Sequence, residues 1–208
     1  MQSHYLEQAF EHGTIMHCWE HEVTPECVEI GDLYLPTGHI VACDPLTLWQ
    51  AAPFIQTVQP GHYPVSLSLI KLPDERWKHV ALAKVTFKNE RPIAWKMALK
   101  PGQDVAELGE DEFFGYGVDT GTGAFLDAQT VEPLQSSVKT HFDDMVETLS
   151  HTCTEPTKGA TIRLDDATGI NFAAFSSGFG DGSYPSYWGY DVDGGVVCLV
   201  TDFGLLTG

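Results

Sequence analysis

Basic residues are scarce in this sequence, and their scarcity excludes two classes of partner. The chain has 208 residues, of which 11 are Lys or Arg and 29 are Asp or Glu, so the formal net charge is −18. A chain this acidic is repelled by phosphate backbones and by anionic membranes. We therefore expect no nucleic-acid partner and no membrane partner, and a basic protein is the electrostatically favourable alternative.

Long apolar runs, a leader pattern and paired-cysteine motifs are also missing. No stretch approaches the ~20 apolar residues that a membrane span needs, and residues 1–10 lack the apolar run of a secretory signal. The five cysteines show no CxxC spacing. This pattern favours reduced thiols, with Cys43 and Cys198 buried inside apolar strands, and a cytoplasmic location.

Common catalytic and cofactor motifs are absent as well. The sequence contains neither a Gly-x-Ser-x-Gly elbow nor a GxxxxGK[S/T] phosphate loop. Gly178 and Gly180 are not followed by a helical pattern, so dinucleotide binding is not supported. We predict no cofactor and assign no residues to a metal site, and the sequence leaves open whether the acidic loops bind a cation. The sequence leaves open whether the protein is an enzyme and favours a protein that is not.

Short apolar segments separated by glycine and proline turns dominate the chain and predict β-strands. They cover residues 28–35, 40–43, 63–69, 80–87, 93–99, 113–118, 124–126, 170–175 and 196–203. Because the connections are short, we expect an antiparallel meander in which 40–43 returns along 28–35. Gly121 and Gly123 fit a hairpin turn after Asp119.

The hydrophobic period changes only once, over residues 137–151, where apolar side chains recur at helical spacing. The predicted fold class is therefore α+β and mostly β, with antiparallel sheets and one principal helix at about 137–151. With 43% hydrophobic residues, the chain has enough apolar material for a proper core. We predict a single domain, 1–208, on which residues 1–27 pack as an N-terminal extension.

The glycine-rich stretch 177–195 is the most distinctive part of the chain. Glycine allows backbone shapes that other residues do not, and aspartate beside such turns closes the turn or presents a carboxylate. Tyrosine and tryptophan are common anchors at protein interfaces, although they also cover sheet faces. The stretch therefore predicts a shaped loop surface whose binding residues are Asp181, Tyr184, Tyr187, Trp188, Tyr190, Asp191 and Asp193.

Two functional hypotheses follow from the distribution of carboxylates, which fill residues 102–138 and 164–208 where no Lys or Arg occurs. The first is a non-enzymatic, acidic, cytosolic binding protein, such as an immunity-like protein that neutralises a basic partner. The alternative is a carboxylate-based hydrolase, with or without a metal ion, that uses Asp119 and Asp181 with Asp191 or Asp193 nearby. Carboxylates that meet in a pocket would favour the hydrolase, and scattered exposure would favour the binding protein.

Asp119 and Asp181 also have a structural interpretation. Each is flanked by glycines, which let the backbone fold tightly enough for the carboxylate to accept bonds from amides one or two residues along. Such bonds would lower the pKa of each carboxyl group. An Asp119→Asn substitution would then cost about 1–3 kcal/mol.

Four blocks of the sequence resemble segments of a known family and occur in the same order along the chain. They read LPTGHIVACDP at 35–45, VQPGHYPV at 58–65, GYGVDTG at 115–121 and SGFGDGSYP at 177–185. Together they resemble a bacterial family known as domain of unknown function 4241. The resemblance spans about residues 31–203 and implies a single domain of bacterial, cytosolic origin. It implies no activity and no catalytic residue.

Overall fold

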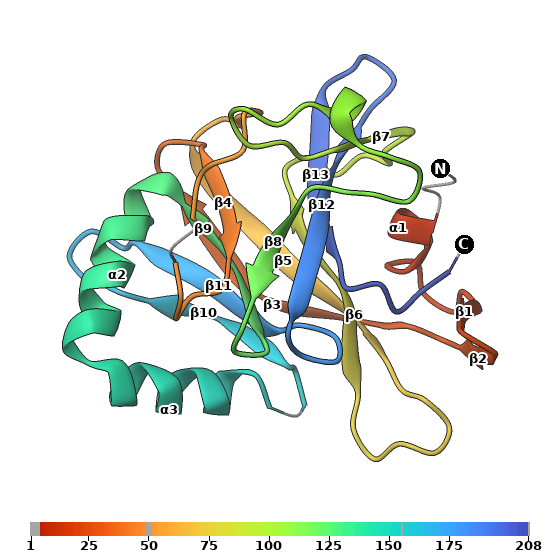
Figure 1. Ribbon diagram of the computed structural model, residues 1–208, viewed down its shortest axis with the longest axis horizontal. Coiled ribbons are helices and arrows are strands. Elements are labelled where there is room, and N and C mark those ends of the chain that lie inside the picture. The colour runs from red at the N-terminus through yellow and green to blue at the C-terminus, as the bar shows by residue number, and fades with distance from the viewer. Residues whose placement is uncertain (1–4, 49–50, 155, 208) are drawn as a thin grey trace.

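Two antiparallel sheets and a pair of helices form three layers (Figure 1). This computed structural model describes residues 5–48, 51–154 and 156–207. The helices lie on one face of a four-stranded sheet, and the other face of that sheet packs against a larger sheet. The prediction of a mostly β, antiparallel fold is confirmed. None of the described helices is long and apolar enough to cross a membrane.

The larger sheet has the strand order β3-β5-β6-β13-β12-β7, and β8 pairs separately with β12. Along β12, residues 182–185 pair with β8 and residues 187–190 pair with β7, so this one strand organises two others. The bounds are β3 (Glu26–Leu35), β5 (Gly61–Ile70), β6 (His79–Thr86), β7 (Ala94–Met97), β8 (Gly115–Val118), β12 (Gly182–Tyr190) and β13 (Val196–Asp202).

The smaller sheet is buried on both faces. Its order is β10-β11-β9-β4, with β4 (Ile40–Cys43), β9 (Thr122–Asp127), β10 (Gly159–Arg163) and β11 (Asn171–Ser176). Phe125 and Phe175 join the core between the sheets, with ring centroids 5.0 Å apart, whereas Leu126 and Phe172 join the core beneath the helices. Successive strand residues alternate between faces, so the apolar run on each strand supplies both cores.

The helical layer consists of α2 (Val131–Thr140) and α3 (Phe142–Thr152), preceded by the short η2 (Ala128–Thr130). The predicted helix over 137–151 is helical, but it begins earlier and is interrupted at His141, whose φ of −133° and ψ of 49° are not helical. The interruption resets the helical phase, which leaves Phe142 53% exposed although the periodicity placed it on the apolar face. Leu134, Val138, Met145 and Leu149 form the buried stripe.

The N-terminal segment packs on the larger sheet. It contains α1 (Tyr5–Gln8) and a small hairpin of β1 (Met16–Cys18) and β2 (His21–Val23). Leu6 and Ala9 are buried, the Ser68 hydroxyl of β5 donates a hydrogen bond to the Ala9 carbonyl at 2.7 Å, and the Tyr5 hydroxyl donates one to Asp202. Two residues after β2 the chain enters β3, the edge strand of the larger sheet.

Several predicted strand pairings are wrong, although the strands themselves exist. Strand β4 does not return along β3 but pairs with β9 in the other sheet, and β7 pairs with β12 rather than with β6. The turn after Asp119 is no hairpin, because β8 and β9 belong to different sheets. A turn signal marks where a strand ends, but the partner of the next strand depends on which face it must bury.

Candidate functional site

The stretch 177–195, predicted as a loop surface, contains the nine-residue strand β12. Only 177–181 and 191–195 form loops, and the strand between them is paired to β13, β7 and β8. The glycines that suggested a loop allow close packing instead: a Cβ on Gly189 would come within 2.7 Å of the Cys198 Sγ atom. The candidate carboxylates therefore sit at the two ends of one buried strand.

Asp119 and Asp181 lie at the same end. Gly182 of β12 and Val118 of β8 are the paired residues at this end of the two strands. Asp181 and Asp119 are the next residues along their strands, so they are neighbours. Both are exposed. The Asp181 Oδ1 atom accepts a hydrogen bond from the Gly121 amide at 3.0 Å. The Asp119 carboxylate makes no hydrogen bond or ion pair with the described residues, so its predicted role as a local backbone acceptor is wrong.

Asp44 fills the structural role that was predicted for Asp119. Its side chain is buried, and its Oδ2 atom accepts hydrogen bonds from the Asp119 amide (3.0 Å), the Thr120 amide (2.9 Å) and the Thr120 hydroxyl (2.8 Å). Its Oδ1 atom accepts one from the Leu46 amide at 2.9 Å. A single carboxylate thus fixes the chain where it crosses from one sheet to the other.

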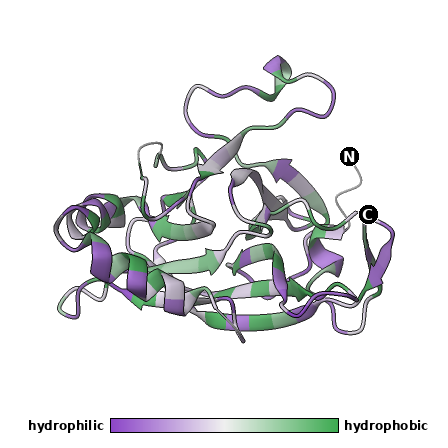
Figure 2. Ribbon diagram, turned by 60° about the horizontal axis from the view of Figure 1, so that its bottom comes forward, coloured by the Kyte–Doolittle hydropathy of each residue, from purple (hydrophilic) through white to green (hydrophobic). Residues whose placement is uncertain are grey.

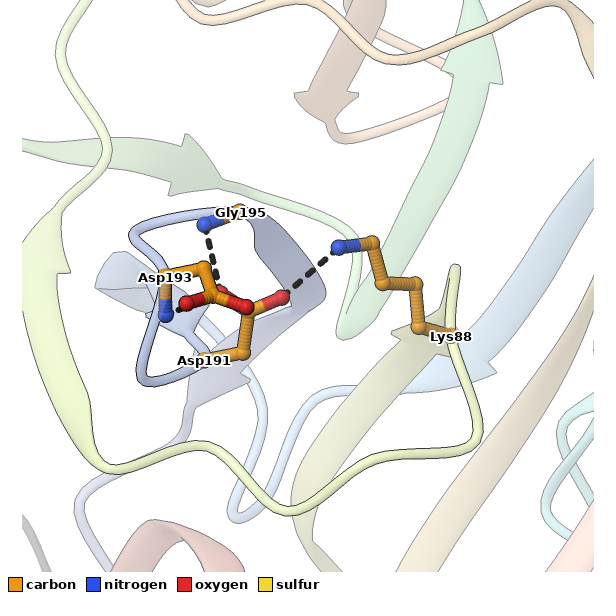
Figure 3. Close-up of polar contacts among 4 residues, drawn as sticks. All are labelled: Lys88, Asp191, Asp193 and Gly195. Carbon is orange, nitrogen blue, oxygen red and sulfur yellow. Dashed lines mark hydrogen bonds and ion pairs between the residues drawn. The ribbon is translucent and has the colours of Figure 1, made fainter.

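Asp191 lies at the opposite end of β12 and is also a structural acceptor (Figure 3). Its Oδ1 atom accepts hydrogen bonds from the amides of Asp193 (3.0 Å) and Gly195 (2.6 Å), and its Oδ2 atom pairs with Lys88 Nζ at 2.7 Å. The Lys88 ammonium, followed by the Gly195 amide, lowers the pKa of the Asp191 carboxyl group. A Cβ on Gly195 would come within 2.4 Å of Lys88 Nζ and 2.7 Å of Asp191 Oδ2, so a larger residue there would displace this ion pair.

The two carboxylate sets do not form one site. Nine residues of β12 separate them, which corresponds to about 30 Å at the usual rise of a strand. Among the residues that the structure describes, no group of three or more His, Cys, Asp or Glu side chains could hold a metal ion. Asp119 and Asp181 therefore cannot combine with Asp191 or Asp193 in one active site.

The aromatic residues of the stretch are mostly part of the core. Tyr187 and Trp188 are 8% and 2% exposed, and the Trp188 ring packs edge-on against Phe54. Tyr184 is half-buried, and its hydroxyl donates to the Gly180 carbonyl at 2.7 Å. Tyr190 is half-buried at the edge of a cleft. Tyr187 and Trp188 thus offer little exposed area to a protein partner, whereas Asp181 and Asp193 are exposed.

Cys43 and Cys198 are also part of the core. Burial raises the pKa of the Cys43 and Cys198 thiols to about 12, which suppresses the thiolate at neutral pH. The prediction that both cysteines behave as small buried hydrophobic residues is confirmed.

A further group of exposed carboxylates lies on the connection between β7 and β8, residues 98–114, which we call the acidic arm. It stands away from the sheets and contains the short η1 (Val105–Glu107) (Figure 2). Its exposed carboxylates are Asp104, Glu107, Glu110, Asp111 and Glu112. Two of them order the arm itself, because Asp104 Oδ1 accepts from the Ala106 amide at 2.9 Å and Glu112 Oε2 accepts from the Gly109 amide at 2.7 Å.

The other three carboxylates of the arm have no partner among the described residues. The side chains of Glu107, Glu110 and Asp111 make no hydrogen bond or ion pair with any residue that the structure describes. Val105 is 52% exposed and Phe113 is 42% exposed on the same connection. The arm therefore presents three uncompensated negative charges together with two accessible apolar side chains.

Sequence reasoning missed two of the residues that order these ends. Asp44 accepts from donors at Asp119 and Thr120, which come 75 and 76 residues later. Lys88 pairs with a carboxylate 103 residues away. No local pattern signals either contact. The sequence shows the run of acidic residues in the arm, but it does not show that the arm protrudes.

These features define an acidic α+β protein in which the buried carboxylates are structural acceptors and the free ones are exposed. The model of the family described as Protein of unknown function (DUF4241) matches residues 33–201. The chain belongs to this family, as the four sequence blocks predicted. No curated protein matches the chain, and no solved structure matches it either.

Proposed function

We propose that this protein is a non-enzymatic binding protein that uses its acidic arm to dock a basic protein partner, in the manner of an immunity protein. The observation that supports this proposal is the arm itself. It carries unpaired carboxylates and exposed apolar residues on a segment that protrudes from the sheets. Such a combination steers a basic partner toward the surface and gives it apolar contacts once it arrives.

The proposed contact surface is the acidic arm, whereas the sequence alone predicted the stretch 177–195. Trp188 and Tyr187 are needed in the core, and Asp191 is used by Lys88 and two backbone amides. Asp193 and Asp181 remain exposed and can add to the acidic field. A cytoplasmic location and a bacterial origin belong to the same proposal, and they rest on the cysteine pattern and on the sequence blocks.

The test is affinity capture from the source cells, followed by kinetics with the captured protein in purified form. The arm variant combines Glu107→Gln, Glu110→Gln and Asp111→Asn, which removes three charges without touching the hydrogen bonds that order the arm. The control variant removes three exposed charges from the helical layer, through Glu132→Gln, Asp143→Asn and Glu147→Gln. Both variants change the net charge by the same amount.

We expect the captured partner to be basic and its association to slow as salt rises. The arm variant should lose most of the association rate, and the helical-layer variant should keep it. Equal losses in both variants would mean that net charge alone matters and that the arm is not the contact. Association rates that do not respond to salt would exclude an electrostatic partner altogether.

A hydrolase remains the second candidate because one observation favours it: Asp119 and Asp181 lie side by side at the end of the β8–β12 pairing. We propose to test it with p-nitrophenyl esters, phosphates and glycosides. A hydrolase would lose turnover in both Asp119→Asn and Asp181→Asn while staying folded. Turnover that persists in either variant, or that is absent in the wild type, removes this candidate.

A further inference from the structure

A cleft beside the C-terminal end of β12 differs in charge from the rest of the molecule. It consists of two hollows of about 500 and 300 Å³ that share Gln56 and Thr57 as a common wall. The larger hollow is lined by Tyr63, Phe87, Lys88 and Val196, among others, and the smaller by Lys96, Met97, Trp188 and Tyr190. The lining includes Leu99 of the acidic arm but none of the arm's carboxylates.

The wall formed by residues 55–59 is held in place by backbone contacts. The Ile55 amide donates to the Leu99 carbonyl at 2.8 Å, and the Val58 amide donates to the Gly38 carbonyl at 3.0 Å. Gly38 has a φ of +71°, and a Cβ there would come within 2.0 Å of the Val58 carbonyl oxygen. Backbone hydrogen bonds at both ends therefore fix the loop that forms this wall, as expected of a pre-formed ligand site.

The described residues that line the two hollows include no Asp or Glu, although the chain has 29 of them. Each hollow has one lysine. Lys88 is neutralised by Asp191, whereas Lys96 has no carboxylate within ion-pair distance among the described residues. Its ammonium group lies 5.1 Å from the centre of the Tyr190 ring. The smaller hollow thus holds a cation that lacks a counter-charge.

A residue that lines the same hollow, Trp188, carries a buried donor without an acceptor. Trp188 is 2% exposed, and its indole Nε1 atom finds no hydrogen-bond partner among the described residues. A buried N–H group without a partner costs about 1–3 kcal/mol, so native proteins rarely leave one without a reason. An acceptor supplied by a ligand would satisfy both this donor and the Lys96 ammonium.

Aromatic rings form the apolar part of the cleft. The Phe87 ring lies edge-on to Tyr63, with centroids 5.0 Å apart, and is 5.9 Å from Trp188. Flat apolar groups pack well against such rings, and a pair of rings in contact contributes about 0.5–1.5 kcal/mol beyond its buried area. The larger hollow therefore suits a planar, uncharged body.

We propose that this cleft binds a small aromatic carboxylate, with the carboxylate on Lys96 and the Trp188 N–H and the ring extending past Gln56 toward Phe87. One unpaired ammonium group matches a single negative charge. The site is independent of the partner proposed for the acidic arm, because none of the arm's free carboxylates lines it. It gives the molecule an anion site despite its net charge of −18.

The test compares 2-naphthoate with the neutral 2-naphthamide by isothermal titration calorimetry and by amide chemical shifts. The wild type should bind naphthoate about tenfold tighter than naphthamide, which corresponds to about 1.4 kcal/mol. Lys96→Gln should abolish this preference, and Lys96→Arg should restore it. Lys139→Gln, on the exposed side of α2, removes the same charge far from the cleft and should leave the preference unchanged.

Three results would overturn the proposal. The first is equal affinity for the acid and the amide in the wild type. The second is a preference that survives Lys96→Gln. The third is no binding of naphthoate at millimolar concentration in a protein that circular dichroism shows to be folded. Because Lys96 is exposed, its substitution should not unfold the chain, so each result can be read directly.

Discussion

Replacing Asp44 by Asn tests whether one buried carboxylate holds the crossing between the two sheets. The side chain is 1% exposed and accepts four hydrogen bonds, three of them on Oδ2. An amide oxygen can take the place of Oδ2, but its NH₂ group then faces the Leu46 amide, which is also a donor. Losing one acceptor and weakening three charged bonds should cost about 3 kcal/mol.

The matched control is Asp119→Asn, because the Asp119 carboxylate is exposed and contacts none of the described residues. We expect its free energy of unfolding to stay within about 0.5 kcal/mol of the wild type. For a chain of this length, about 3 kcal/mol corresponds to a fall in Tm of roughly 6–12 °C for Asp44→Asn. Urea unfolding followed by circular dichroism and thermal unfolding would measure both variants.

The reasoning would be refuted if the two substitutions had equal effects. It would also be refuted if Asp44→Asn left stability unchanged while Asp119→Asn lowered it. Either outcome would mean that the crossing is held by packing rather than by the carboxylate. Asp44→Ala would then be expected to cost no more than Asp44→Asn.

Two further predictions concern pH dependence and backbone geometry. Burial raises the pKa of Asp202 above the ordinary 3.8, so the folded state holds this proton more tightly than the unfolded state. The stabilisation from that proton is full below pH 3.8 and is lost as pH rises through the folded pKa. Urea midpoints should therefore show the wild type gaining stability relative to Asp202→Asn as pH falls toward 4, and parallel midpoints would contradict this. Gly38→Ala should destabilise by more than about 2 kcal/mol, because its Cβ would meet the Val58 carbonyl oxygen. Gly102→Ala, also at positive φ but in open space, should cost only about 1 kcal/mol; equal losses in thermal unfolding would show that the contact with Val58 is unimportant.

The candidate site was only partly accessible from the sequence. The sequence predicts the acidic run of residues 102–138, but the protrusion of the acidic arm depends on where β7 and β8 attach to β12. Asp181 was expected to bind a nearby amide and binds Gly121 instead, 60 residues away. Asp191 was expected to close its own turn or to meet other carboxylates, and it closes the turn while also pairing with Lys88.

The sequence by itself determined the fold class, the positions of most strands and the helical region, because these depend on the local period of apolar residues and on turn residues. It also determined the family, through four blocks spread along residues 33–201. Only the tertiary structure decided which strands pair, why 182–190 is a buried strand and how Asp44 and Lys88 meet partners far along the chain. A local pattern records which residues are apolar, whereas pairing and polar contacts depend on which surfaces remain to be buried once the whole chain has collapsed.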